Sequence, residues 1–293
     1  MSSQQGLLSA GGRVRRRKRV NRAVEGVWLL SSAVAVAVLA IVTISVLVKG
    51  IPGLDLDLFT KTPVTFGESG GGIAHAFVGS LILVGMAAAM ALPVGVLAAI
   101  YVSEFADQRI ARGIKLTLDV LNGFPSIVIG IFLYVLLVVG RGQNGFIGAL
   151  SLAIIMLPLI SRATQEILAL VPNYLREGSL ALGVSKWRTI MGVILPTTFS
   201  GILTGTTLAV ARAAGETAPL LFTSSLFGDW ISGDPNSAMA SIPVIIFEYS
   251  EAPDPHLNDQ AWAAAFVLIT FVLVVSLLSR AALARSRRKL ERG

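Results

Sequence analysis

The segment RAAGET, Arg212 to Thr217, places an arginine and a glutamate at the end of a long apolar run. Arg212 and Glu216 lie four residues apart, so on a continuing helix they share a face and can form an ion pair. A guanidinium also binds other oxyanions through two parallel hydrogen bonds. Two interpretations therefore remain open: the pair fixes two helices, or the arginine acts on an anion. Pro219 indicates that the helix ends soon after the pair.

The residues before Arg212 are unusually rich in glycine and small hydroxyl side chains. Gly201 and Gly205 form a G-x-x-x-G pattern, which lets a neighbouring helix approach closely. Hydroxyl groups on such a helix can donate hydrogen bonds to a solute that passes along it. Packing alone explains this face as well as a solute pathway does. The candidate pathway residues are Thr204, Thr207 and, just beyond the pair, Thr217.

The helix that positions these residues is predicted to cross a membrane. Hydrophobic residues make up 54% of the chain and charged residues 14%, whereas a soluble domain carries about a quarter charged residues. A spanning helix needs about 20 mostly apolar residues. The sequence therefore predicts an all-α polytopic membrane protein with six transmembrane helices. The predicted spans are about 27–48, 73–102, 118–140, 142–161, 189–214 and 261–279, within a membrane domain of residues 27–280.

The first of these spans follows a basic region, as the apolar core of a signal peptide does. Its apolar run, Val27 to Val48, is longer than the roughly 7 to 15 residues of a signal core. We therefore predict a first transmembrane helix. The second span contains Pro93, and a tilt or kink is expected there.

The distribution of arginine and lysine predicts the orientation of the spans. The tail 1–26, the segment from Arg280 to the C-terminus, which includes the tail 281–293, and the loops 103–117 and 162–188 hold 20 of the 24 basic residues, whereas the opposite loops hold three. The loop 217–260 has six acidic residues and no basic one. We expect both tails and both basic loops to be cytoplasmic. The basic runs are interpreted as juxtamembrane anchors rather than nucleic-acid sites.

Several kinds of chemistry have no basis in this sequence. It has no cysteine and no Gly-Lys dipeptide, so thiolate sites and the phosphate-binding loop of ATPases are excluded. The two histidines, His75 and His256, are far apart, and no His-Glu-x-x-His metal motif occurs. We predict no catalytic residue, no metal site and no cofactor. A transport subunit is therefore favoured over an enzyme.

The loop before the fifth span reads EGSLALGVSKWRTIMGVILP, residues 177–196. Gly183 allows a turn between two short helices, and Ser185 is expected to cap the second one. An apolar ridge on such a loop must be covered by its own bundle or by the groove of a partner. The ridge is formed by Leu180, Val184 and Trp187.

This loop resembles the coupling loop of ABC importer permeases, whose pattern is Glu-Ala-Ala, three residues, Gly, nine residues, Ile-x-Leu-Pro. Gly178, Ser179 and Val193 depart mildly from that pattern. The resemblance implies that the loop inserts into a cytoplasmic ATPase subunit. The implied coupling residues are Glu177, Leu180, Gly183, Trp187, Leu195 and Pro196.

More of the chain is similar to one branch of that family, the PstA-type permeases of phosphate-specific ABC importers within the binding-protein-dependent transport permeases. The similar stretches are ESGGGIAHAFVGSLILVG (68–85), LPVGVLAAIYVSEF (92–105), LNGFPSIVIGIF (121–132) and RAAGETAPLLFT (212–223). This resemblance implies a MetI-like, type I permease fold and inorganic phosphate as the substrate. It also implies a heterodimer with a second, homologous permease, two cytoplasmic ATPase subunits, an external phosphate-binding protein and a prokaryotic inner membrane.

Under this resemblance, Arg212 would meet the phosphate and Glu216 would hold or release the arginine. The alternatives are a permease of another ABC importer, for molybdate, sulfate or an amino acid, an ion-coupled secondary anion transporter, or a structural membrane subunit without pathway residues. A helix that starts at Leu195 places Arg212 roughly 25 Å along its axis, in the outer half of the membrane.

Overall fold

The computed structural model describes residues 10–64, 70–224 and 230–290, and all regular structure in these ranges is helical. The chain divides into two units, Met1–Lys49 and Gly50–Gly293. The first unit is formed by the long helix α2 (Ala10–Gly50). Large apolar side chains are exposed along α2, among them Trp28, Leu29 and Leu30. The first predicted span lies inside this helix, which is long and apolar enough to cross a membrane.

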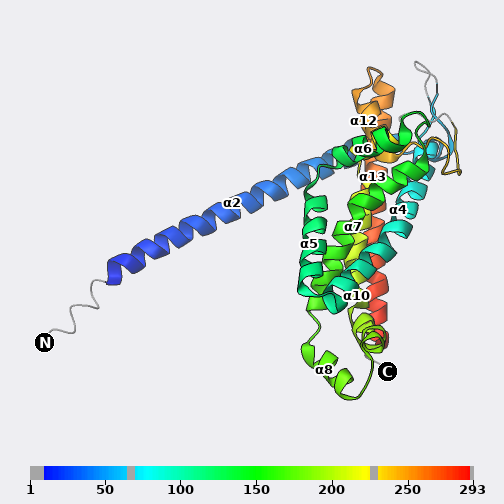
Figure 1. Ribbon diagram of the computed structural model, residues 1–293. Coiled ribbons are helices and arrows are strands. Elements are labelled where there is room, and N and C mark those ends of the chain that lie inside the picture. The colour runs from blue at the N-terminus through cyan, green and yellow to red at the C-terminus, as the bar shows by residue number, and fades with distance from the viewer. Residues whose placement is uncertain (1–9, 65–69, 225–229, 291–293) are drawn as a thin grey trace. The chain divides into compact units, whose positions relative to one another are not determined.

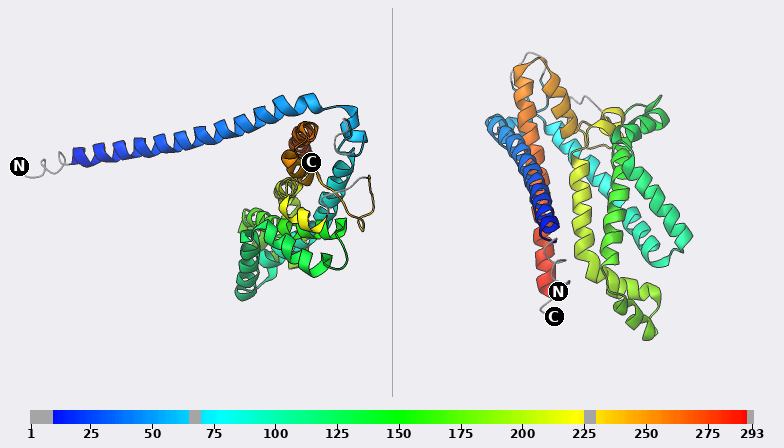
Figure 2. Two further views of the ribbon diagram at one scale, coloured as in Figure 1. Left: turned by 90° about the horizontal axis from the view of Figure 1, so that it is seen from above. Right: turned by 90° about the vertical axis from the view of Figure 1, so that its left-hand side faces the viewer.

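Long helices packed side by side form the body of the second unit (Figures 1 and 2). They are α4 (Ala74–Ile100), α7 (Gly145–Ala169), α10 (Leu195–Ala214) and α13 (Pro255–Leu290). A π-helical turn, η2 (Tyr101–Phe105), extends α4, while α9 (Lys186–Thr189) and the π-helical turn η4 (Ile190–Ile194) precede α10. Each of these four segments is long and apolar enough to span a membrane. The predicted all-α membrane architecture is therefore confirmed.

The main core lies where α4, α7 and α10 meet. Leu83, Leu152, Met156 and Ile160 have no exposed surface. Small residues let the helices approach closely: a Cβ atom on Gly95 would lie 2.9 Å from the Ile160 side chain. Ser161 strengthens the contact by donating a hydrogen bond of 2.9 Å to the Gly95 carbonyl.

The third predicted span, 118–140, is not a single helix. It consists of α5 (Gln108–Gly123), α6 (Ser126–Leu133) and the π-helical turn η3 (Tyr134–Val138), and the chain bends by 95° between α5 and α6. Pro125 has no backbone N–H, and a proline disfavours the helical conformation of the residue before it. Phe124 accordingly has an extended backbone, with φ −70° and ψ 133°. The structure thus has five continuous candidate spans, or six when the bent pair counts as one.

In its described residues, the loop 217–260 contains two short helices that pack against the bundle, α11 (Ala218–Thr223) and α12 (Ile242–Glu251). Pro219, Leu220 and Thr223 of α11 are buried, and so are Ile242 and Ile245 of α12. The α12 residues share a core with Leu58 of α3 (Leu56–Thr60), which follows η1 (Ile51–Gly53), and with α13. Residues 225–227, which end the apolar run 220–227 of the sequence, lie outside the described residues.

The connection between α7 and α10 forms a separate projection. It contains α8 (Asn173–Ala181) and α9. Figure 1 shows α8 at one end of the bundle and α12 at the other. The end of α13 lies at the same end of the bundle as α8.

Candidate functional site

Arg212 and Glu216 meet where α10 ends. The helix stops at Ala214, and the backbone N–H of Gly215 turns back to the Arg212 carbonyl. Glu216 therefore does not lie on a continuing helix, yet its Oε1 is 3.7 Å from Nε of Arg212. That distance is too long for a hydrogen bond, so the contact is a loose ion pair. The Arg212 side chain is 56% exposed and that of Glu216 only 15%.

The segment that carries Glu216 is fixed by contacts outside the pair. The Gln143 side-chain amide donates to the Leu221 carbonyl over 2.9 Å, and the Asn144 backbone N–H donates to the Thr223 carbonyl. Gly130 of α6 lies so close that a Cβ atom there would be 2.6 Å from Cα of Pro219. The position of Glu216 is thus set by the docking of α11 against α6 and the start of α7.

The three predicted pathway threonines lie in different surroundings. Thr204 is exposed, and its hydroxyl donates to the Ser200 carbonyl of the same helix over 2.9 Å. Thr207 is half-buried and donates to the Leu203 carbonyl over 2.8 Å. Both hydroxyl hydrogens are therefore directed to α10 itself rather than to a solute. Thr217 is half-buried at the N-cap of α11 without a side-chain capping bond.

Gly201 and Gly205 lie in the contact between α10 and α7. A Cβ atom on Gly201 would be 2.7 Å from the Ile167 side chain, and one on Gly205 would be 2.5 Å from Cβ of Ala163. These distances leave no room for a side chain. The glycine face of α10 is therefore a packing face, and the exposed face with Thr204 and Arg212 lies beside it.

The loop 177–196 forms the helix–turn–helix that the sequence predicts. Gly183 has a positive φ of 75° between α8 and α9. Leu180 and Trp187 are 50% and 53% exposed, so the ridge is largely uncovered. The Trp187 ring lies 6.5 Å from that of Phe105 at the end of α4. Ser185 is the N-cap residue of α9, but its side chain makes no capping bond, contrary to expectation.

The remaining predicted coupling residues lie at the two ends of the loop. Glu177 is exposed on α8. Leu195 packs against the core formed by Ile100, Leu168 and other residues of the loop end of the bundle. Pro196 occupies the first turn of α10, where a missing N–H leaves no helical bond unmade.

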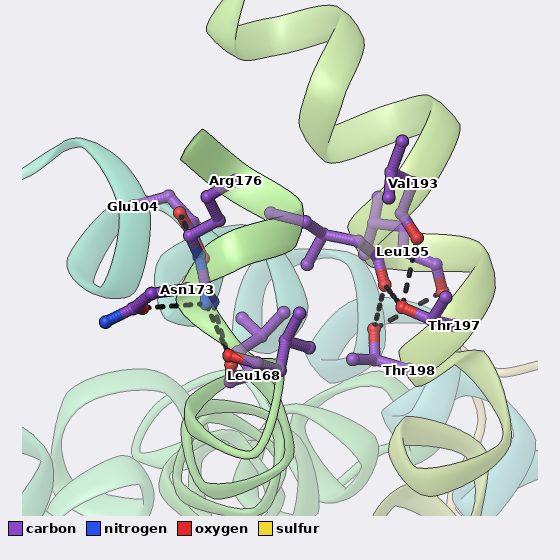
Figure 3. A network of polar contacts seen from close by, with 10 residues as sticks. Glu104, Leu168, Asn173, Arg176, Val193, Leu195, Thr197 and Thr198 are labelled. Atoms are coloured by element: carbon purple, nitrogen blue, oxygen red, sulfur yellow. Dashed lines mark hydrogen bonds and ion pairs between the residues drawn. The ribbon is translucent and has the colours of Figure 1, made fainter. Parts of the chain in front are cut away.

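A buried ion pair that the sequence analysis missed anchors this loop (Figure 3). Nη2 of Arg176 on α8 lies 2.8 Å from Oε1 of Glu104 in η2, with side chains 22% and 6% exposed. The Arg176 guanidinium also donates to the carbonyls of Leu168 and Val171, at the end of α7 and just beyond it. One arginine thus joins α8 to both α4 and α7. Seventy-two positions separate the two partners, so spacing gives no signal for the pair.

Glu248 of α12 is half-buried, and one of its carboxylate oxygens lies in an unfavourable environment. Oε2 of Glu248 on α12 is buried and has no hydrogen-bond partner among the described residues. Burial raises the pKa of this carboxyl above its ordinary value of 4.5, because a charged carboxylate loses its hydration there.

The structure thus has a partly exposed arginine at a helix break and a protruding loop that a buried ion pair anchors to the bundle. The family described as binding-protein-dependent transport system inner membrane component matches residues 91–292. The chain belongs to this family. The Haemophilus influenzae phosphate transport system permease protein PstA is 39% identical to this permease over 266 residues, which are 90% of this chain and 94% of that protein.

Further relatives are similar over most of the chain. The PstA of Xylella fastidiosa is 38% identical and covers 93% of this chain and 96% of its own length. PstA 1 of Mycobacterium tuberculosis is 40% identical and covers 71% of this chain and 68% of its own length. These relatives are named as permeases, which are transport subunits rather than enzymes. The recognition of a PstA-type permease from the sequence is confirmed.

Solved structures support the fold. An inward-facing MetNI methionine ABC transporter matches with a TM-score of 0.56 at 17% identity, over 73% of this chain and 94% of that chain. A bacterial alginate ABC transporter matches with a TM-score of 0.59 at 14% identity, over 86% of this chain and 92% of that chain. This permease therefore has the MetI-like ABC permease fold and is embedded in a membrane.

Proposed function

We propose that this chain is the transmembrane permease subunit of an ATP-driven importer for inorganic phosphate and forms half of the translocation pathway. The observation that carries the proposal is the exposed guanidinium of Arg212, held only loosely by Glu216, in a chain 39% identical to a PstA. A guanidinium pairs with phosphate oxygens through two charge-assisted hydrogen bonds. Phosphate and the Glu216 carboxylate then compete for the same arginine.

The proposed roles of the other pathway residues follow from their positions. Thr204 lies two turns before Arg212 on the exposed face of α10. A threonine hydroxyl that donates to a backbone carbonyl still accepts hydrogen bonds, so it suits a protonated phosphate oxygen. Thr207 and Thr217 complete the proposed pathway at the side of α10 and at the start of α11.

The proposed coupling element is the loop 177–196. Its exposed ridge of Leu180 and Trp187 suits the groove of a cytoplasmic ATPase subunit. The Arg176–Glu104 pair then passes the movement of the loop to α4. A Gly183→Val change would force a β-branched residue into a left-handed turn, and we expect lower uptake and weaker ATPase co-purification at near-normal membrane levels.

The proposed assembly contains a second, homologous permease, two ATPase subunits and an extracytoplasmic phosphate-binding protein in a prokaryotic inner membrane. Both termini and the loop 177–196 face the cytoplasm in this proposal. The supporting observation is the distribution of basic residues, since positive charge marks the cytoplasmic side.

Arg212→Gln tests the proposed function. It should abolish phosphate uptake while the protein remains in the membrane with its ATPase assembled. Arg212→Lys should restore only part of the uptake, because an ammonium lacks the planar fork of a guanidinium. The double change Arg212→Glu with Glu216→Arg keeps an ion pair between the two positions but exchanges the places of the positive and the negative charge. Normal transport by that double variant would identify the pair as structural and overturn the proposed role of Arg212.

A further inference from the structure

Three helices of the second unit turn exposed sides in a common direction. On α10, Gly201 and Gly205 face α7, and the buried residues Ala209 and Ala213 face the core. Successive helical residues are rotated by about 100°, so the core lies on one side of the α7 contact and an exposed stripe lies on the other. This stripe is formed by Thr204, Leu208 and Arg212.

On α7, the contacts with α10 and α4 place Arg162 on the exposed side of the helix. Ala163 faces α10 at Gly205, and Ile160 faces α4 at Gly95. Arg162 is rotated about 100° from Ala163, away from that core, and its Nη2 pairs with Oδ1 of Asp119 on α5. Because α7 runs antiparallel to α10, the exposed sides of both helices lie on the same side of their contact.

On α5, polar side chains continue from this ion pair toward the end of the bundle that carries α8. A surface hollow of about 570 Å³ is lined by Gln108, Ala111, Arg112, Lys115, Leu116 and Asp119. Arg112 and Lys115 are exposed and form no ion pair with any residue that the structure describes. Arg109 belongs to the same helix but does not line the hollow.

The depth of these groups relative to Arg212 follows from the helix contacts. Gly205 lies against Ala163, and Arg212 is seven residues further along α10, which is roughly 10 Å of helix. Arg162 is therefore the next cation on this face after Arg212. Lys115 lies one turn of α5 before Asp119, and Arg112 lies nearly a further turn before Lys115.

We propose that Arg162, Lys115 and Arg112 form a second oxyanion site, which receives phosphate after it leaves Arg212 and releases it at the end that carries α8. This inference rests on the proposed function and extends it to the exit of the pathway. Lysine and arginine bind phosphate oxygens strongly. Asp119 and the exposed Glu166 on α7 moderate that attraction, as an exit requires, since a transported ion must bind weakly enough to leave.

The phosphate group of an anionic lipid has the same chemistry as inorganic phosphate, so the experiment must separate the two sources. We use the complete transporter, reconstituted with its ATPase and binding protein in vesicles of phosphatidylcholine alone or with phosphatidylglycerol added. The variants are Lys115→Gln, Arg112→Gln, their combination, and Arg162→Gln with Asp119→Asn, which leaves no unpaired charge. The matched control is Arg109→Gln, which removes the same charge from the same helix outside the hollow.

The Lys115→Gln and Arg112→Gln combination should lower the maximal uptake rate about tenfold, the order of a local charge-focusing effect. The external phosphate concentration for half-maximal uptake should stay unchanged, because entry is not altered. As the ionic strength rises, the maximal uptake rate of this variant should approach that of the unmodified protein, because salt screens the removed charges. The Arg162→Gln and Asp119→Asn combination should also have a lower maximal uptake rate with unchanged half-saturation, and Arg109→Gln should transport at the normal rate. The ionic-strength dependence separates a charge effect from a structural defect, because a smaller number of functional transporters would lower the maximal uptake rate by the same factor at every salt concentration.

Three results would overturn the inference. An equal loss in Arg109→Gln would assign the effect to general surface charge. A loss seen only in vesicles with phosphatidylglycerol would assign the site to a lipid headgroup. Full activity of the Lys115 and Arg162 variants would remove the exit site, while an inactive Arg212→Gln in the same preparation would leave the proposed function intact. If Arg212→Gln also transported normally, the proposed function itself would fail.

Discussion

Replacing Glu104 by glutamine should uncouple the loop 177–196 from the membrane helices. Glu104 accepts from Arg176 through both carboxylate oxygens, with distances of 2.8, 3.2 and 3.3 Å. Glutamine keeps one acceptor oxygen but loses the charge. Arg176 keeps its bonds to the carbonyls of Leu168 and Val171, at 2.9 and 2.6 Å. Arg176 therefore stays bound to the end of α7 and loses its strong link to α4.

The free-energy cost of Glu104→Gln follows from this loss of only part of the contacts of Arg176. A buried ion pair that loses one partner costs roughly 3–5 kcal/mol, but the remaining carbonyl bonds and the 22% exposure of Arg176 lower this cost. One charge-assisted hydrogen bond, about 2 kcal/mol, is the better measure. This corresponds to about a thirtyfold rise in the equilibrium for detachment of α8 from α4.

Two assays follow this detachment. Limited proteolysis should cut the segment 172–186 faster in Glu104→Gln, because α8 opens more often. In the reconstituted transporter, phosphate uptake per ATP hydrolysed should fall, although the ATPase stays bound. Glu25→Gln makes the same chemical change at an exposed position and serves as the control. Unchanged protection together with unchanged uptake per ATP would refute the role assigned to the Glu104–Arg176 pair.

Three further predictions concern packing, protonation and orientation. Gly205→Val should destabilise the bundle by about 1–3 kcal/mol, because its Cβ would lie 2.5 Å from Cβ of Ala163; thermal unfolding measures this, and Ala163→Gly should restore part of the loss. Burial raises the pKa of Glu248 above 4.5, so the folded state binds the carboxyl proton more tightly than the unfolded state does, and the stability of the protein should fall as pH rises above 4.5. Glu248→Gln should remove that fall, and melting temperatures that change with pH in the same way in the variant and the unmodified protein would contradict the prediction. Cysteines at positions 185 and 237 test the orientation with an impermeant reagent on intact cells: Ser237→Cys should react and Ser185→Cys should not, and the reverse pattern would exclude the proposed topology.

The sequence predicted those parts of the fold that depend on local properties. Apolar length predicted where α4, α7, α10 and α13 run, because a spanning helix requires about 20 apolar residues wherever it packs. Gly183 predicted the turn between α8 and α9, because glycine adopts the positive φ of such a turn without steric strain. The spacing of Gly201 and Gly205 predicted a close helix contact. It did not predict that α7 is the partner.

The features that the sequence missed depend on contacts between distant segments. Pro125 was a sufficient signal for a break in the third span, yet the 95° bend depends on how α5 and α6 pack afterwards. The Glu104–Arg176 pair could not be predicted, because the two residues meet only after α4 and α7 have packed together. A lone glutamate at the end of a long apolar helix was the one available signal.

The geometry at the end of α10 favours one of the two interpretations of Arg212 and Glu216, the action on an anion, over the tether. A tether should hold its partners through short, shielded hydrogen bonds, as Arg176 and Glu104 do at 2.8 Å. Arg212 instead lies 3.7 Å from Glu216 and is 56% exposed, while α11 is held in place by Gly130, Gln143 and Asn144. The helix break would therefore persist without the pair. This geometry supports the proposal that Arg212, placed beside a carboxylate that compensates its charge, exchanges that carboxylate for a passing anion.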